Sequence, residues 1–304
     1  MPMKSKQNLV TSAMLLATLA LFASACGATS NAAAEINGRK ISRSELELTV
    51  TELSEVGQAP VVDGEVDGET VRSILSALVQ GAATDQLLKE YGQEITSADR
   101  DTIEAQISQN TDTSTYTQHL KDLIIELNAG SLALGRVVAP DAKKAAEMYG
   151  KAPASLGVLC VRHLVVKTEA TANEALAKFA DGTEFAALAG EFSTEPNAKE
   201  SGGALGGADN ACITLTEYQS GFDNDFTAGA MMAKPGVAYG PVKSSFGYHV
   251  IYVRPFVEVA EDISKLLATS AGANLLNGYI ATSKIKIDSM YGVWNAARGG
   301  IVTS

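Results

Sequence analysis

Histidine, cysteine and glycine are the residues whose types and spacing bear most directly on chemistry in this sequence. The 304 residues include three histidines, His119, His163 and His249, too few for a histidine-rich metal site. The patterns H-E-x-x-H, G-x-S-x-G and C-x-x-C are absent, which argues against zinc hydrolases, serine hydrolases and thiol oxidoreductases. The glycine-rich stretch 201–207 lacks G-x-G-x-x-G, which argues against nucleotide binding. We therefore expect a function that needs no metal and no cofactor.

Two of the histidines lie in predicted strands at the ends of an α+β segment. His163 belongs to the run 158–166, which is apolar on both faces and predicts a central strand. His249 belongs to a second predicted strand, residues 248–254. Between them, a capping-box pattern at 171–174 predicts the start of the first of two short helices, and a glycine-rich loop follows. This order of elements is typical of an α+β domain.

Five ordered segments within residues 157–256 resemble the parvulin family of peptidyl-prolyl cis/trans isomerases. They are Val161–Val166, Phe185–Ser193, Ser201–Gly206, the pair Phe222 and Phe226 followed by Lys234–Gly236, and Gly240–Val242 followed by Phe246–Ile251. The resemblance implies a small antiparallel sheet flanked by helices. It also implies catalysis of rotation about X–Pro amides, whose barrier is about 18–20 kcal/mol. Such a catalyst must bind the twisted amide better than either planar form, using an apolar pocket for proline and polar groups near the carbonyl.

The resemblance also assigns expected roles to single residues. The paired family histidines correspond to His163 and His249, which would share one hydrogen-bonded network and set the polarity of the pocket floor. Glu195 stands where the family has cysteine or aspartate, and Ser244 keeps a hydroxyl where threonine or serine is common. The predicted proline-binding residues are Leu205, Phe222 and Phe226, with Met231 standing where an aromatic residue is usual nearby.

Structural explanations remain open for several of these residues. A histidine in an apolar strand commonly fills a core position, and Phe222 and Phe226 are also consistent with an ordinary core. Glu195 is also consistent with an exposed loop position. His119 lies three residues after Tyr116 on a predicted helix, and we expect it to be structural.

The amino terminus resembles that of an exported lipoprotein. Lys4 and Lys6 precede an apolar stretch from Leu9 to Ala23, which suits a signal peptide better than a membrane span. The sequence Ala23–Cys26 resembles a bacterial lipoprotein box, which implies cleavage after residue 25 and lipid attachment to Cys26 at the outer face of a membrane. Simple secretion with an incidental cysteine is the alternative. Residues 26–34 are small and polar and are expected to form a tether.

The other two cysteines are expected to form a disulfide. Export places the chain in an oxidising compartment, and lipidation of Cys26 would leave only Cys160 and Cys212. The parvulin arrangement brings these two regions close together, so we predict a bond between them. Two free buried thiols are the alternative.

The rest of the chain is expected to be helical. An Asn-Gly pair at 37–38 predicts a hairpin, and helices are predicted near 69–92, 97–109, 113–128 and 141–149. These elements would form a helical chaperone domain over 35–155, before a parvulin domain at 156–257. Residues 258–304, a helix from 259 to about 279 and an extended tail, would return to pack on it. This layout resembles exported foldases of the SurA and PrsA type.

This resemblance implies that the partners are unfolded exported polypeptides containing X–Pro bonds. The net charge of −11 argues against nucleic acid as a partner. A second interpretation is a non-catalytic holdase that uses its parvulin domain for client binding. Histidines and phenylalanines at the family positions favour the enzyme, whereas Glu195 and Met231 keep the holdase open.

Overall fold

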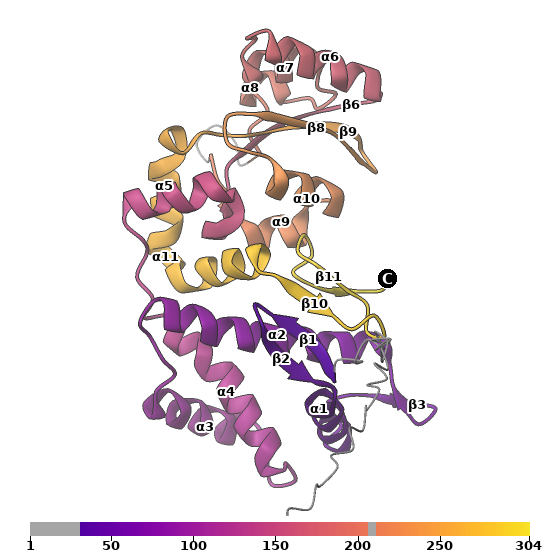
Figure 1. Ribbon diagram of the computed structural model, residues 1–304, viewed down its shortest axis with the longest axis vertical. Helices are drawn as coiled ribbons and strands as arrows, with labels where there is room; N and C mark the ends of the chain where they lie inside the picture. Colours follow the sequence, from indigo (N-terminus) through magenta and orange to yellow (C-terminus); the bar gives the residue numbers. More distant parts are fainter. Residues whose placement is uncertain (1–30, 206–210) are drawn as a thin grey trace, which may run out of the picture. The chain divides into compact units, whose positions relative to one another are not determined.

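A three-stranded antiparallel sheet carries His163 and His249 (Figure 1). The computed structural model describes residues 31–205 and 211–304. In spatial order the strands are β6 (Val161–Val166), β9 (Gly247–Val253) and β8 (Ala238–Ser244). His163 pairs with Ile251 and His249 pairs with Val165, so the two histidines lie diagonally opposite on the same face of the sheet.

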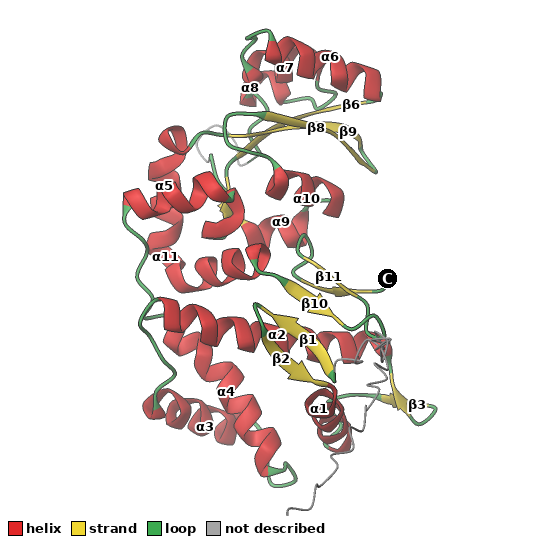
Figure 2. Cartoon of the chain, viewed as in Figure 1, coloured by secondary structure: helices red, strands yellow, loops and turns green. Residues whose placement is uncertain are grey.

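Helices cover both faces of this sheet (Figure 2). One face packs against α6 (Glu169–Ala180) and α7 (Phe185–Phe192) in a buried cluster of small and aliphatic side chains. The histidine face packs against α10 (Asn224–Met232). This double cover explains why β6 is apolar on both faces. The prediction that β6 is a central strand is wrong, because β9 occupies the centre.

The edge of β6 that faces away from β9 is covered by the segment after α7. The Thr194 amide donates to the Val165 carbonyl at 2.9 Å, and the His163 amide donates to the Gly203 carbonyl at 2.8 Å. Backbone groups that an edge strand would otherwise expose are therefore satisfied next to the histidine. This segment and its continuation contain α8 (Ala198–Ser201), β7 (Ile213–Thr214) and α9 (Leu215–Gly221).

A second three-stranded sheet joins the two ends of the described chain. Its order is β10-β1-β2, with β1 (Ala32–Ile36), β2 (Arg39–Ser42) and β10 (Ile285–Ile287). The predicted hairpin at Asn37 is confirmed, and Asn37 adopts a positive φ of 47° in its turn. The two N–H groups of the Asn37 side chain lie within hydrogen-bond distance of Tyr279, Ser283 and Gln86, and its oxygen accepts from the Lys284 amide.

The remaining elements are mostly helical. The helices are α1 (Arg43–Glu55), α2 (Gly68–Glu90), α3 (Ser97–Asn110), α4 (Gln118–Leu134), α5 (Ala142–Lys151), the 3-10 helix η1 (Pro153–Leu156) and α11 (Phe256–Thr282). The remaining strands are β3 (Val61–Val62), β4 (Glu65–Val66), β5 (Val158–Leu159), β11 (Val293–Asn295) and β12 (Gly300–Val302).

Some predicted boundaries differ from the structure for identifiable reasons. The helix predicted from 113 begins at Gln118, because Thr117 accepts the Leu120 amide as its N-cap. The first helix after β6 is capped by Thr168 rather than by Thr171. Strand β8 was not predicted, since it contains Gly240 and Pro241, two residues depleted in strands.

The amino-terminal predictions fall largely outside the described residues. The signal peptide at 1–25 and the lipidation site Cys26 lie there, and so does most of the tether at 26–34. Ala32–Ala34 are an exception, because they are buried in β1 and are not part of a tether. The predicted domain limits at 155, 257 and 304 stay predictions, since residues 32–304 form one compact unit. None of the helices in the described ranges is long and apolar enough to cross a membrane.

Candidate functional site

The two histidines form a buried pair in direct contact. Their Nδ1 atoms lie 3.3 Å apart and their rings are nearly parallel, at an interplanar angle of 17°. The exposed fractions are 6% for His163 and 5% for His249. This proximity follows from the diagonal register of β6 and β9, which directs both side chains to one face.

Polar partners extend the pair into a four-residue relay. Glu195 Oε2 lies 3.0 Å from His163 Nε2, and Ser244 Oγ lies 2.6 Å from His249 Nε2. The Phe246 amide donates to Ser244 Oγ at 3.0 Å. The relay therefore runs Glu195, His163, His249, Ser244, and includes all four residues predicted to be catalytic.

The donor inventory assigns the protons when both rings are neutral. A carboxylate only accepts, so His163 Nε2 carries a proton and its Nδ1 accepts from His249 Nδ1–H. His249 Nε2 then accepts from the Ser244 hydroxyl, whose oxygen in turn accepts the Phe246 amide. Each ring nitrogen in the buried pair has a partner in this arrangement, which satisfies both imidazoles without a net charge.

Electrostatics favour this neutral arrangement. Burial and, to a smaller extent, the neighbouring His163 together lower the pKa of His249 from 6.5 to about 4, although Glu195 and Asp223 act in the opposite direction. The hydrogen bond from His163 lowers the pKa of Glu195, which outweighs the opposing effect of burial. At neutral pH the site therefore combines a neutral His249 with an ionised carboxylate.

An apolar floor adjoins the relay. The Phe226 ring centroid lies 5.1 Å from that of His163 and 5.0 Å from that of His249, and Phe226 is 2% exposed. Phe222 stacks on Phe226 at 5.9 Å and on Tyr218 at 4.9 Å. These rings form an apolar surface next to the polar relay, an arrangement suited to holding a proline ring beside an amide.

A pocket of about 370 Å³ opens over this surface. Its lining includes six predicted site residues: His163, Glu195, Leu205, Phe222, Phe226 and His249. Ser244 does not line it, but contacts His249 directly. Met231 is not brought to the pocket; it is partly buried against the main core from the far end of α10.

Among the lining residues that sequence reasoning missed, two bear on the chemistry of the pocket. Asp223 lines it and caps α10, accepting the amides of Asp225 and Phe226 through Oδ1. Phe246 also lines it from the turn between β8 and β9, with 75% of its surface exposed. The available signal for Asp223 was its residue type, because aspartate is a preferred N-cap and this residue directly precedes α10.

Gly203 allows the glycine loop to approach the strand that carries His163. Its φ is +79°, and a Cβ added there would lie 2.2 Å from the His163 carbonyl oxygen. Only glycine combines this conformation with this contact. The loop thereby brings Leu205 to the pocket beside the relay.

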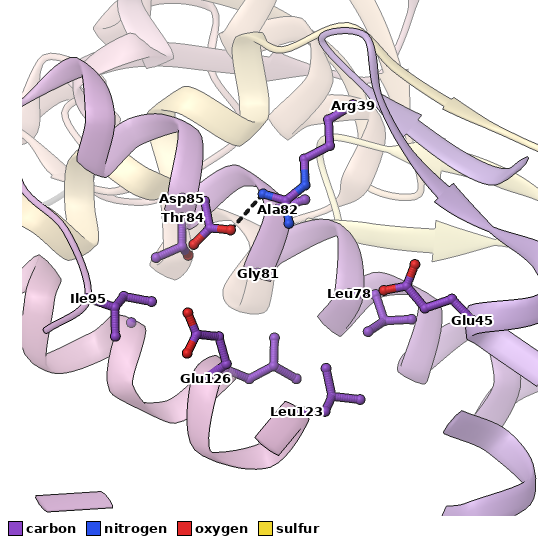
Figure 3. A pocket seen from close by; sticks show the side chains of 12 residues that line it. Arg39, Glu45, Leu78, Gly81, Ala82, Thr84, Asp85, Ile95, Leu123 and Glu126 are labelled. Atoms are coloured by element: carbon purple, nitrogen blue, oxygen red, sulfur yellow. Dashed lines mark hydrogen bonds and ion pairs between the residues drawn. The ribbon is translucent and has the colours of Figure 1, made fainter. Parts of the chain in front are cut away.

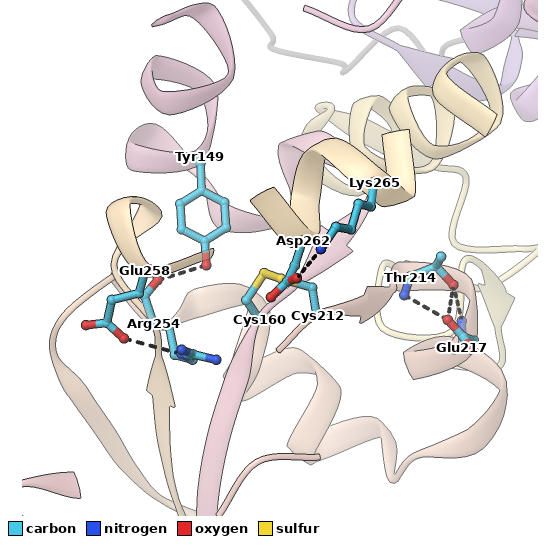
Figure 4. The surroundings of a disulfide bond; sticks show 9 residues. All are labelled: Tyr149, Cys160, Cys212, Thr214, Glu217, Arg254, Glu258, Asp262 and Lys265. Carbon is cyan, nitrogen blue, oxygen red and sulfur yellow. Dashed lines mark hydrogen bonds and ion pairs between the residues drawn. A yellow bond between two sulfur atoms is a disulfide. The ribbon is translucent and has the colours of Figure 1, made fainter. Parts of the chain in front are cut away.

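The predicted disulfide between Cys160 and Cys212 is present (Figure 4). Both cysteines are buried, and Cys160 directly precedes β6. Cys212 directly precedes β7, which pairs with β5. The bond therefore ties the chain after the glycine loop to the base of the sheet.

Other cavities show less chemistry. The one in Figure 3, of about 80 Å³, lies between α2 and α4. Among its charged side chains, Arg39 pairs with Asp85 at 2.6 Å and Glu126 pairs with Arg100 at 2.7 Å. His119, predicted to be structural, bonds the buried Glu52 at 2.6 Å. Among the described residues, no group of three or more His, Cys, Asp or Glu side chains is placed to hold a metal ion.

Comparison with known proteins places the pocket in a recognised domain. Residues 165–255 match the Rotamase family model, described as a PPIC-type PPIASE domain, so this part of the chain is a domain of that type. The match includes Glu195, His249 and the phenylalanines of the floor. The parvulin resemblance of this segment is therefore confirmed.

Relatives extend the similarity beyond this domain. Foldase protein PrsA of Clostridium kluyveri is 44% identical over 89 residues, covering 29% of this chain and 24% of that protein. Foldase protein PrsA of Clostridium botulinum strain Hall is 25% identical over 275 residues, covering 77% and 80% respectively. The match to the crystal structure of PrsA from Bacillus subtilis covers 83% of this chain and 92% of the Bacillus subtilis chain, with 21% sequence identity and a TM-score of 0.30. The chain thus spans about a quarter of the Clostridium kluyveri relative.

Proposed function

We propose that this chain is a peptidyl-prolyl cis/trans isomerase that assists the folding of exported polypeptides. The observation that carries the proposal is the relay of Glu195, His163, His249 and Ser244 beside an apolar pocket, within a PPIC-type domain. The relatives named foldase protein PrsA support a role in assisting protein folding.

Catalysis would rest on binding the twisted amide. The proline ring would pack on Leu205, Phe222 and Phe226, away from water. Conjugation with nitrogen increases the partial negative charge on the oxygen of a planar amide, and twisting reduces that charge. The ionised Glu195 at the pocket therefore disfavours the planar form relative to the twisted one.

The histidines would act by position rather than by proton transfer. No covalent bond changes during rotation, and each ring nitrogen is engaged within the relay. Their function would be to hold Glu195 on one side and the β8–β9 turn on the other, in a fixed and polar arrangement beside the apolar floor.

The direct test is the isomerisation rate of a short X–Pro peptide with the purified protein. We expect acceleration with the unsubstituted protein and its loss in a His249→Ala, Phe226→Ala double variant. Circular dichroism of the variant controls for unfolding. No acceleration by the folded unsubstituted protein, over a panel of residues before proline, would reject the enzyme.

A non-catalytic holdase is the second candidate, and one observation favours it. Glu195 is longer than the family's aspartate or cysteine, and its side chain is 44% exposed. A refolding reaction limited by proline isomerisation distinguishes the two functions. An isomerase shortens the slow phase, whereas a holdase suppresses aggregation and leaves that phase unchanged.

We also propose that the protein is lipid-anchored through Cys26 at the outer face of a membrane. The sequence pattern before Cys26 supports this, and mass spectrometry of the protein from its native membrane would test it.

We further propose that residues 258–304 form one domain with residues 35–155. The pairing of β10 with β1 and the contacts of Asn37 with Tyr279 and Ser283 support this second proposal.

A further inference from the structure

The rim of the pocket carries two acidic side chains. Glu195 lines it from the loop after α7, and Asp223 lines it from the start of α10. No lysine or arginine is among the described residues that line it. The charged lining is therefore entirely acidic, apart from whatever charge the two histidines acquire.

Neither carboxylate has a cationic partner in the described part of the chain. The ion contact of Glu195 is with His163, which already belongs to the relay. Asp223 contacts backbone amides and, at 3.5 Å, the hydroxyl of Ser245. Both carboxylates raise the pKa of His249, although the larger effect of burial lowers it. The negative charges of both side chains therefore act on the same imidazole in the pocket.

An exposed aromatic ring completes this rim. Phe246 is 75% exposed although phenylalanine normally gains free energy from burial. Its backbone amide is held by Ser244 Oγ, and the neighbouring Ser245 hydroxyl reaches Asp223. An open aromatic face beside two carboxylates is the combination that binds a cation with an apolar stem.

We propose that the pocket prefers X–Pro bonds in which X is lysine or arginine. This inference rests on the proposed isomerase function and names its substrate class. With proline on the apolar floor, the side chain of the preceding residue lies at the rim. Its methylene groups pack against Phe246, and its charge is stabilised by Asp223 and Glu195. A phosphorylated or acidic residue at the same place is repelled.

The test compares peptides that differ only in X: lysine, arginine, glutamine, leucine and glutamate. We expect kcat/KM for lysine and arginine to exceed that for glutamine by about five- to tenfold, as two partly exposed charge pairs would give. Glutamate is expected to be the slowest. The lysine-to-glutamine ratio should fall as salt is raised, because screening weakens exposed pairs.

The Asp223→Asn variant isolates the charge. Asparagine is as good an N-cap as aspartate, so α10 is expected to remain intact. We expect the lysine-to-glutamine ratio to fall by about threefold, the value of one exposed pair. Asp225→Asn is the matched control, since it removes the same charge two residues away on an exposed side chain outside the pocket lining. It should leave the ratio unchanged.

The Phe246→Leu variant isolates the ring. It keeps apolar area and the backbone hydrogen bond to Ser244, but removes the aromatic face. We expect the lysine-to-glutamine ratio to fall by less than it does in the Asp223→Asn variant.

The possible outcomes distinguish a failure of the charge preference from a failure of the proposed isomerase function. Acceleration of no peptide rejects the isomerase itself. Three other outcomes reject the charge preference but keep the isomerase function. They are equal rates for lysine and glutamine, the fastest rate for leucine, and an Asp225→Asn effect as large as that of Asp223→Asn.

Discussion

At the scale of single residues, the site combines a buried neutral imidazole with a nearby ionised carboxylate. Burial holds His249 neutral, and the hydrogen bond from His163 holds Glu195 ionised. An uncharged imidazole needs no counter-ion and tolerates an apolar neighbour such as Phe226. Its geometry is therefore expected to be sensitive to protonation and to the loss of any one partner.

The first prediction concerns pH. The pKa of His249 is about 4 in the folded protein and 6.5 when unperturbed, so the unfolded chain binds this proton first as pH falls. The stability contributed by the neutral ring is complete above about pH 6.5 and is lost as pH falls towards about 4. We expect an isomerase rate that is constant from about pH 8 to 6 and falls with a midpoint near pH 4. A midpoint near pH 6.5 would contradict a His249 that burial keeps neutral.

The second prediction concerns Ser244. In the Ser244→Ala variant His249 Nε2 and the Phe246 amide both lose their partner. We expect kcat/KM to fall about three- to tenfold, the effect of one lost hydrogen bond of about 1 kcal/mol. Ser245→Ala is the control, because its hydroxyl has only a 3.5 Å contact to Asp223. Equal rates for the two variants would show that Ser244 has no functional role in the relay.

Sequence motifs located most of this site, and the exceptions have physical reasons. His163 and His249 were predictable because strand periodicity and ordered motifs fix both the face and the family position. Met231 does not line the pocket because it lies five residues after Phe226 on α10, which turns its side chain about 140° away around the helix. Asp223 and Phe246 were missed as pocket residues because their role depends on how α10 and the β8–β9 turn approach each other in space.

At the scale of elements, the glycine loop and the disulfide position the segment that carries Leu205. The third prediction is that Gly203→Ala is destabilising by about 2 kcal/mol or more, through both its positive φ and the contact with the His163 carbonyl. Gly182→Ala separates these causes. Gly182 has φ +95° with nothing within 4 Å of an added Cβ, so only the backbone cost of about 1 kcal/mol applies. Urea unfolding of both variants measures the difference, and equal losses would contradict the close approach.

The fourth prediction concerns the bond between Cys160 and Cys212, which are separated by 52 positions in sequence. Replacing both by alanine is expected to lower the free energy of unfolding by about 2–4 kcal/mol, because the unfolded chain gains freedom. Cys26→Ala keeps the bond and serves as the control in the same urea titration. Unchanged stability of the double variant, with the bond verified by mass spectrometry in the parent, would overturn this account.

Element boundaries were less predictable than element types. The long helices were recognisable from apolar periodicity, whereas their starts depend on which hydroxyl accepts an amide, as at Thr117 and Thr168. Strand β8 lacked a sequence signal because its glycine and proline lie where the register with β9 shifts, between Tyr239 and Val242. Tertiary pairing, rather than propensity, decides such segments.

At the scale of the whole molecule, the first and last parts of the described chain meet at Asn37. The fifth prediction is that Asn37→Asp lowers the free energy of unfolding by about 1–3 kcal/mol, because the carboxylate cannot donate to Gln86, Tyr279 and Ser283. Aspartate tolerates the positive φ and keeps the acceptor for Lys284. Asn173→Asp, at an exposed position of α6, is the matched control and should change stability by less than about 0.5 kcal/mol. Equal effects in thermal unfolding would rule out this role for the amide.

The pairing of β1 with β10 also sets an order of events during synthesis. Glu35 pairs with Lys286, so one edge of β1 has no partner until almost the entire chain has been made. The sheet of β6, β8 and β9, by contrast, is complete once residue 253 has been made. A growing chain therefore finishes its pocket while its first strand is still open, and that open edge is the part most exposed to pairing with other chains.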